Sequence, residues 1–226
     1  MAAPLATATD AATDAAGSAR LLAVQLLSPA FPTGAFAYAQ GLEWAMDQGM
    51  IRDADGLACW LGDVLAHGAG WSDAVILSLA LRPGADHAAL DDLARALCLS
   101  SERLTDTLEQ GAAFARTAAA LTGAPASAAA LPVAVGRALS GQPLPRAEVI
   151  ALYLHGQALN LTLAAVRYLP LGADQGQALL HGLGPAILHL SARAADAGES
   201  DLGTCAIGAE IAQMRHETMQ TRIFRT

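Results

Sequence analysis

The feature that most constrains the fold of this chain is its supply of helix-forming residues. Alanine dominates the sequence, aromatic residues make up only 4% of it, and no useful run alternates between apolar and polar positions. Alanine costs least to place in a helix, whereas strands favour β-branched and aromatic side chains with a period of two. Hydrophobic residues make up 54% of the chain, which is ample material for a core. The sequence therefore predicts an all-α fold, a single globular bundle of about ten helices.

Prolines, glycines and small polar residues divide the chain into its predicted helices. Residues 29–34 hold two prolines and a glycine, so no helix can pass through them. Helices are expected at residues 20–27, 35–48, 53–67, 71–81, 88–97, 100–121, 133–140, 145–168, 174–197 and 206–220. Residues 1–19 are expected to be a disordered leader, followed by one helical domain over residues 20–226 that ends in a docking tail.

Two segments bear on the location of the protein. Residues 1–18 contain neither a basic n-region nor an apolar h-region, so they do not resemble a signal peptide. Residues 149–166 carry no formal charge and approach the length of a membrane-spanning helix. That segment also contains His155, Gln157, Asn160 and Thr162, which are costly in lipid, so we expect a core helix and no membrane contact. Three widely separated cysteines are typical of a reducing compartment.

The charged residues exclude several classes of protein. All 13 positive charges are arginines, and the net charge is −8. Without a lysine the chain cannot form a conventional P-loop or a Schiff base. Without a basic patch it is unsuited to binding nucleic acid.

Metal-binding and catalytic patterns are missing from the sequence. Neither His-Glu-x-x-His nor paired Cys-x-x-Cys occurs, and His181 and His189 are too far apart on one helix to share an ion. We interpret the histidines as surface residues or hydrogen-bonded core residues. Cys59 and Cys98 lie in apolar helical patterns and are interpreted as buried, inert thiols. No catalytic residue, metal ligand or cofactor-binding residue is predicted.

Residues 31–43, Phe-Pro-Thr-Gly-Ala-Phe-Ala-Tyr-Ala-Gln-Gly-Leu-Glu, form an unusual segment that we call the N-terminal motif. On a helix, one face would form a core stripe of Ala35, Ala39, Leu42 and Met46. A second face would carry polar residues together with one aromatic: Phe36, Gln40, Glu43 and Asp47. Phe36 either folds back over the loop as a hydrophobic staple or is an exposed anchor for a partner.

Residues 213–226, which we call the C-terminal tail, are the second unusual segment. Although the body is acidic, the tail carries Arg215, Arg222 and Arg225 among methionine, isoleucine and phenylalanine side chains. Chain ends are usually frayed and polar. A mixture of arginine and apolar residues is typical of a docking element, and the alternative is that the tail packs on its own domain.

Three segments in register resemble the UreF family of urease accessory proteins. The motif residues Pro32-Thr-Gly-Ala-Phe-Ala-Tyr-Ala-Gln-Gly-Leu-Glu43 resemble the family's N-terminal signature. Ala165-Val-Arg-Tyr-Leu-Pro-Leu-Gly172, followed by Gly176-Gln177, resembles its central helix junction. Asp201-Leu-Gly203, His216-Glu217 and Arg222-Ile-Phe-Arg-Thr226 resemble its C-terminal signature. The similarity runs from about Leu21 to the end. Departures are Ala37 and Ala39, where the family often has serine, and Ala173, where it commonly has glutamine.

The resemblance implies a cytoplasmic, dimeric, non-catalytic chaperone for nickel insertion during urease maturation. Its implied partners are the UreD scaffold (also called UreH), the UreG GTPase and apo-urease. Nickel and GTP would then be handled by these partners, and this chain would bind no cofactor directly. We assign a UreG-facing set to the N-terminal motif: Gly34, Phe36, Tyr38, Gln40 and Glu43. We assign a UreD/UreH-facing set to the tail: His216, Glu217, Arg222, Phe224 and Arg225. The alternatives are a helical enzyme with a buried small-molecule pocket and a structural helical module.

Overall fold

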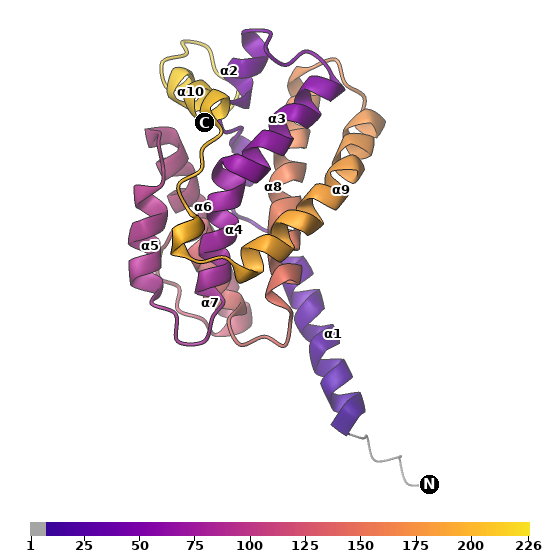
Figure 1. The fold of residues 1–226 in the computed structure, drawn as a ribbon, viewed down its shortest axis with the longest axis vertical. Coiled ribbons are helices and arrows are strands. Elements are labelled where there is room, and N and C mark those ends of the chain that lie inside the picture. The colour runs from indigo at the N-terminus through magenta and orange to yellow at the C-terminus, as the bar shows by residue number, and fades with distance from the viewer. Residues whose placement is uncertain (1–7) are drawn as a thin grey trace.

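The computed structural model describes residues 8–226, and every regular element in that range is a helix. The α-helices are α1 (Ala8–Leu26), α2 (Leu42–Asp47), α3 (Ala54–His67), α4 (Ala69–Ala80), α5 (His87–Ala96), α6 (Ser101–Thr122), α7 (Leu131–Leu139), α8 (Arg146–Tyr168), α9 (Ala173–Asp196) and α10 (Ile207–His216). Two short 3₁₀ helices are η1 (Ala35–Ala37) and η2 (Glu199–Asp201). The predicted all-α bundle is confirmed (Figure 1).

Local capping explains where several helices begin. The Asp53 carboxylate accepts a hydrogen bond from the Gly56 amide at the start of α3, at 2.9 Å. The Ser100 hydroxyl accepts one from the Arg103 amide at the start of α6, at 3.0 Å. Each bond satisfies an amide that has no partner within its helix. These caps confirm the predicted starts of both helices.

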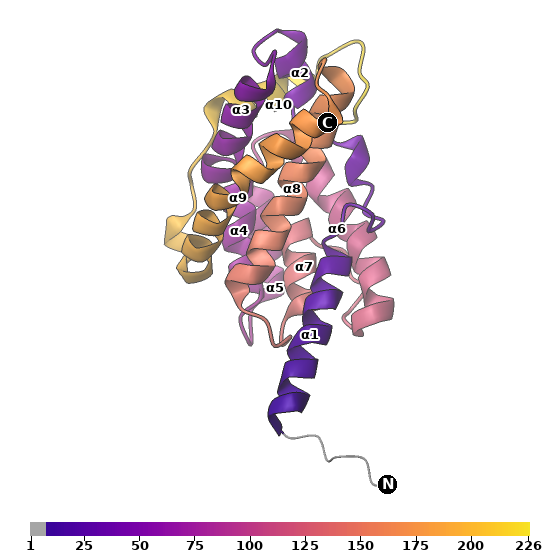
Figure 2. The same cartoon turned by 90° about the vertical axis from the view of Figure 1, so that its right-hand side faces the viewer.

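The core lies around α8 and α4, which the other helices surround (Figures 1 and 2). Phe114 of α6 is almost fully buried and stacks against Phe31, with ring centroids 5.3 Å apart. Within the described residues only α8 is long and apolar enough to cross a membrane by length and composition, and half of its apolar stretch is buried in the bundle. A core helix has the same composition, so this one helix is weak evidence for a membrane span.

The first helix differs from the sequence prediction. α1 begins at Ala8 and not at Arg20, so residues 8–19 are helical where a disordered leader was expected. The remaining part of that leader, residues 1–7, lies outside the described residues. The alanine-rich sequence favours helix by itself, and the second half of α1 also contacts the body through an ion pair between Arg20 and Glu148. The first half projects away from the bundle (Figures 1 and 2).

The predicted helix over residues 35–48 is also wrong, because the chain is not helical between η1 and α2. Gly34 and Gly41 have φ angles of 79° and 76°, and Gln40 has a φ of 52°. A left-handed conformation ends a right-handed helix. The last helix, expected to reach residue 220, ends at His216.

Candidate partner-docking site

The N-terminal motif is held against the backbone of α10. A Cβ atom at Gly41 would lie 2.5 Å from the amide nitrogen of Gln213, closer than real Cβ contacts. Gly41 therefore meets two requirements, a positive φ and a close approach between backbones. The motif turns at this point and directs Leu42 and Glu43 into the interior, where both are buried.

The C-terminal tail runs beside the motif. The amide of Ala39 donates to the carbonyl oxygen of Thr226, and the amide of Arg225 donates to the carbonyl oxygen of Ala37, both at 2.8 Å. Phe224, which directly precedes these two tail residues, has only 4% of its surface exposed. The tail thus packs on its own domain, which was the alternative to a free docking element.

Three buried charged residues and the exposed Arg222 fix this arrangement, and we call Glu43, Glu102, His216 and Arg222 the tail cluster. The Glu43 carboxylate accepts hydrogen bonds from the amides of Ile223, at 2.7 Å, and Phe224, at 2.9 Å. Its second oxygen lies 3.1 Å from Nε2 of His216, a residue with no exposed surface. Glu43 was expected on an outward polar face, and that expectation is wrong because the break at Gly41 rotates α2.

The other side of the tail cluster is formed by Glu102 of α6. One of its oxygens lies 2.7 Å from Nδ1 of His216, and the other accepts from the Arg222 guanidinium at 2.7 Å. Burial raises the pKa of Glu102, while the bonds to His216 and Arg222 oppose that effect. Both nitrogens of His216 therefore face a carboxylate oxygen, one from Glu43 and one from Glu102.

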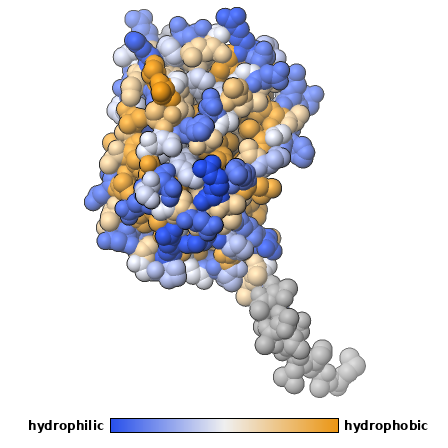
Figure 3. All heavy atoms as spheres, in the orientation of Figure 1, coloured by the Kyte–Doolittle hydropathy of each residue, from blue (hydrophilic) through white to orange (hydrophobic). Residues whose placement is uncertain are grey.

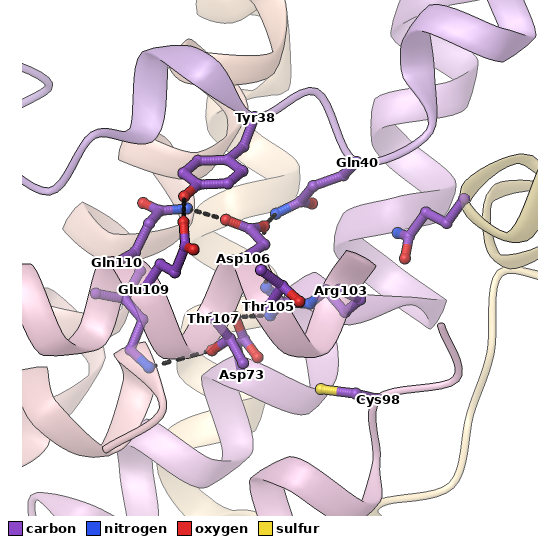
Figure 4. A network of polar contacts seen from close by, with 12 residues as sticks. Tyr38, Gln40, Asp73, Cys98, Arg103, Thr105, Asp106, Thr107, Glu109 and Gln110 are labelled. Atoms are coloured by element: carbon purple, nitrogen blue, oxygen red, sulfur yellow. Dashed lines mark hydrogen bonds and ion pairs between the residues drawn. The ribbon is translucent and has the colours of Figure 1, made fainter. Parts of the chain in front are cut away.

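Tyr38 and Arg225 join the motif to the tail at the surface. The Tyr38 hydroxyl donates to the Glu109 carboxylate (Figure 4). Glu109 also pairs with Arg225 at 2.8 Å. Burial raises the pKa of the Tyr38 hydroxyl, and the bond to Glu109 adds to the shift. The same bond lowers the pKa of Glu109. This contact is partly exposed, so water weakens it.

Gln40 connects the motif to a buried polar network that sequence reasoning missed. Its amide donates to Asp106 at 2.9 Å, and Asp106 is also bonded to Gln110 and Arg103 (Figure 4). The Arg103 guanidinium donates to Asp73 at 2.6 Å. Burial raises the pKa of Asp106, and the charge of Arg103 opposes that rise.

The only sequence signal for this network was the polar spacing along α6. The apolar residues Leu104, Leu108 and Ala112, which share one face of α6, are each only half-buried. The buried face instead includes polar residues: Glu102, Arg103, Asp106, Thr107 and Gln110. Their recurrence every three or four residues is the spacing of one helix face.

Phe36 is an exposed aromatic residue and not a core staple. Its side chain is 63% exposed, and the Arg167 guanidinium lies 3.6 Å above its ring centroid. Arg167 also lies 4.4 Å from the Phe224 ring and donates to the Phe36 carbonyl oxygen at 2.9 Å. Ile223 is 69% exposed. We call Phe36, Arg167 and the exposed tail residue Ile223 the motif–tail patch, in which Arg167 contacts Phe36 and the Phe224 ring next to Ile223.

Comparison with known proteins identifies the family. A model of the UreF family matches residues 51–184. A protein of Paracoccus denitrificans named Urease accessory protein UreF is 63% identical over 209 residues, which is 92% of this chain and 97% of the relative. The chain belongs to the UreF family. A relative of the same name from Cereibacter sphaeroides is 55% identical over 92% of this chain and 100% of its own length. Another, from Roseobacter denitrificans, is 44% identical over 91% of this chain and 93% of its own length.

The two sets of residues assigned from the UreF resemblance form one continuous structure. In the UreG-facing set, Gly34 begins η1, Phe36 is exposed, Gln40 is half-buried, and Tyr38 and Glu43 are buried. In the UreD/UreH-facing set, His216 and Phe224 are buried, Arg222 and Arg225 are partly exposed, and Glu217 accepts a hydrogen bond from the Ser101 amide at 2.8 Å. Their roles toward partners stay predictions.

The described residues of this UreF-family chain contain no group of three or more histidine, cysteine, aspartate or glutamate side chains that could hold a metal ion. Cys59 is exposed, so the prediction that it is buried is wrong, because its position on α3 faces away from the core. Cys98 is half-buried, and burial raises the pKa of its thiol to about 11. A thiol with a raised pKa is a weak nucleophile at neutral pH.

Proposed function

We propose that this chain is a non-catalytic adaptor that links the UreD/UreH scaffold to the UreG GTPase during GTP-dependent insertion of nickel into apo-urease. It acts in the cytoplasm as a homodimer within that complex, and the partners handle GTP and nickel. Membership of the UreF family supports the assignment to urease maturation. The absence of lysine from the sequence agrees with GTP hydrolysis by a partner, since a P-loop needs that residue.

The observation that carries the adaptor role is the motif–tail patch. Phe36 and Ile223 expose apolar side chains to water, and Arg167 stacks on the Phe36 ring and bonds to its carbonyl oxygen. Aromatic and arginine side chains are enriched among residues that dominate binding energy. We therefore assign the motif–tail patch to the GTPase partner.

A second apolar surface lies on the outer face of α10. Ile207, Ile211 and Met214 are 67%, 48% and 44% exposed and follow one another at helical spacing. An apolar patch is visible in the region of α10 (Figure 3). We assign this face, together with the tail arginines Arg222 and Arg225, to the scaffold partner. Two separate apolar surfaces are what a bridging protein requires.

The GTPase assignment is tested by Phe36→Ala. Because Phe36 is mostly exposed, the substitution should change the melting temperature little, whereas a buried phenylalanine would cost about 3–5 kcal/mol. A pull-down should show loss of UreG with the scaffold retained. Leu188→Ala is the matched control, since Leu188 of α9 is 65% exposed and lies outside both surfaces. Retention of UreG at wild-type affinity by the Phe36 variant would remove this residue from the docking surface.

The scaffold assignment is tested by Arg225→Ala. Arg225 pairs with partly exposed Glu109, so its loss should cost less than about 1 kcal/mol of stability. Binding of the scaffold should weaken measurably, while Arg116→Ala, at an exposed position on α6, should not change it. Deletion of residues 222–226 is a poor test, because it also removes buried Phe224. Unchanged scaffold binding by the Arg225 variant would contradict the assignment.

The alternatives make different predictions in cells. A helical enzyme would turn over a small molecule without partners, and a structural module would co-purify with neither UreG nor the scaffold. An affinity-tagged chain should retain both proteins if it is an adaptor. Recovery of the chain alone from cells that express both partners would refute the proposal.

A further inference from the structure

A cavity of about 90 Å³ lies beneath the N-terminal motif. It is lined by the end of α1, residues within the segment 27–40, and α4, α6, α7 and α8. Its lining is mainly apolar at Leu26, Phe114 and Leu161. The docking surfaces described above do not use this cavity, so its chemistry stands independently of the proposed function.

The polar groups around the cavity include hydrogen-bond acceptors that lack partners. Gln40 and Gln157 both line it, and the Oε1 atom of each is buried without a hydrogen-bond partner among the described residues. A buried acceptor of this kind costs free energy unless a donor reaches it. Two such amides on different segments, at one cavity, indicate a guest that donates N–H or O–H bonds.

The charged residues of the lining indicate that the guest is neutral. Asp73 and Arg103 both line the cavity and bind each other at 2.6 Å, and the Tyr153 hydroxyl also donates to Asp73, at 2.7 Å. A cation would meet the Arg103 guanidinium, and an anion would meet the Asp73 carboxylate. Each would disturb a buried charge pair that is already satisfied.

The volume limits the size of the guest. A cavity of about 150 Å³ accommodates benzene, with its six non-hydrogen atoms. In proportion, 90 Å³ holds a molecule of about four non-hydrogen atoms. Several water molecules would fill the same space, so a guest binds only if its contacts with the cavity lining are more favourable than those of the water that it displaces.

We propose that this cavity binds a small neutral amide of the size of acetamide or urea. The N–H groups of such a molecule would donate to the free oxygens of Gln40 and Gln157. Its carbonyl oxygen would accept from the Gln157 amide nitrogen, since two amides can exchange reciprocal hydrogen bonds. The apolar wall formed by Phe114 and Leu161 would exclude larger polar molecules.

Occupancy would be coupled to the N-terminal motif. Gln40 holds a left-handed backbone conformation, with φ at 52°, and Asn160 of the lining donates to the Tyr38 carbonyl oxygen at 3.2 Å. A strained non-glycine residue persists only where its surroundings hold it. A guest bonded to the Gln40 amide would therefore slow hydrogen exchange of the amides at residues 38–42.

The test uses acetamide and the full-length protein. Saturation-transfer NMR should show contact between protein and the acetamide methyl group, with saturable binding that urea competes and benzamide, with nine non-hydrogen atoms, does not. Gln157→Leu should weaken binding at least tenfold, because the guest loses its reciprocal bonds. Gln177→Leu, at an exposed site on α9, should bind as wild type does.

Three results would overturn the proposal. The first is no saturation transfer to acetamide in the wild-type protein, and the second is equal competition by benzamide. The third is a high-resolution crystal structure, soaked in acetamide, in which the cavity contains only water. If Gln157→Leu fails to fold, the wild-type protein still decides the question, because urea should displace acetamide and benzamide should not.

Discussion

Replacement of Glu43 by glutamine tests whether the tail cluster holds the tail in place. Glu43 is 2% exposed, and its carboxylate faces the amides of Ile223 and Phe224 and the ring of His216. A hydrogen bond to a charged group contributes about 1.5–3 kcal/mol, and a glutamine oxygen can keep only part of this set. Its NH₂ group would also face a backbone amide, donor against donor. We expect a loss of about 3 kcal/mol in the free energy of unfolding.

For a chain of this length, that loss lowers the melting temperature by about 6–12 °C. Thermal unfolding gives the total, and hydrogen exchange at the Ile223 and Phe224 amides gives the local effect. Asp47→Asn is the matched control, because Asp47 is an exposed carboxylate on the same helix and should change stability by less than about 0.5 kcal/mol. The reasoning is refuted if Glu43→Gln has the same melting temperature as the Asp47→Asn control. It is also refuted if Glu43→Gln is destabilised while the Ile223 and Phe224 amides stay protected from hydrogen exchange.

Two further substitutions test separate parts of the structure. Gly41→Ala should lower the free energy of unfolding by about 3 kcal/mol, because of backbone strain and contact with α10. Gly17→Ala, where no neighbour lies within 4 Å, should raise that free energy by up to about 1 kcal/mol. Equal effects of the two substitutions in thermal unfolding would contradict this reasoning. Burial raises the pKa of Glu210, against the effect of Arg103, so the folded state resists its ionisation. The Glu210→Gln variant should therefore be as stable as wild type in acid and more stable than wild type as the pH rises. Denaturant titrations that show the opposite trend would exclude burial of Glu210 as the cause.

The sequence predicted those parts of the fold that depend on local chemistry. α3 and α6 begin beside residues 53 and 100, where helices were predicted to start, and α8 is the core helix inferred from the polar residues within its apolar run. In each case the signal lies within a few residues of the element itself. Helix type and number followed from propensity and punctuation alone.

The motif and the tail could not be placed in this way. The turn at Gly41 depends on the backbone of α10, and the burial of Glu43 depends on a tail that is 180 residues away. A helical pattern assigned Glu43 to the outward face because it considered only neighbouring positions. The buried polar face of α6 was missed for a related reason: a charged residue is interpreted as exposed unless its partner is known, and Asp73 comes 30 residues earlier.

The long separation between Glu43 and its tail partners also sets an order of events during synthesis. The N-terminal motif leaves the ribosome long before residues 216–226, so the carboxylate of Glu43 and the backbone edge at residues 37–39 wait without partners. Closing a loop of this length is slow compared with forming the neighbouring helices. The surface around Phe36 therefore reaches its final shape only after residues 216–226 have been synthesised. A prematurely terminated chain could fold most of its helices and still fail to present that surface.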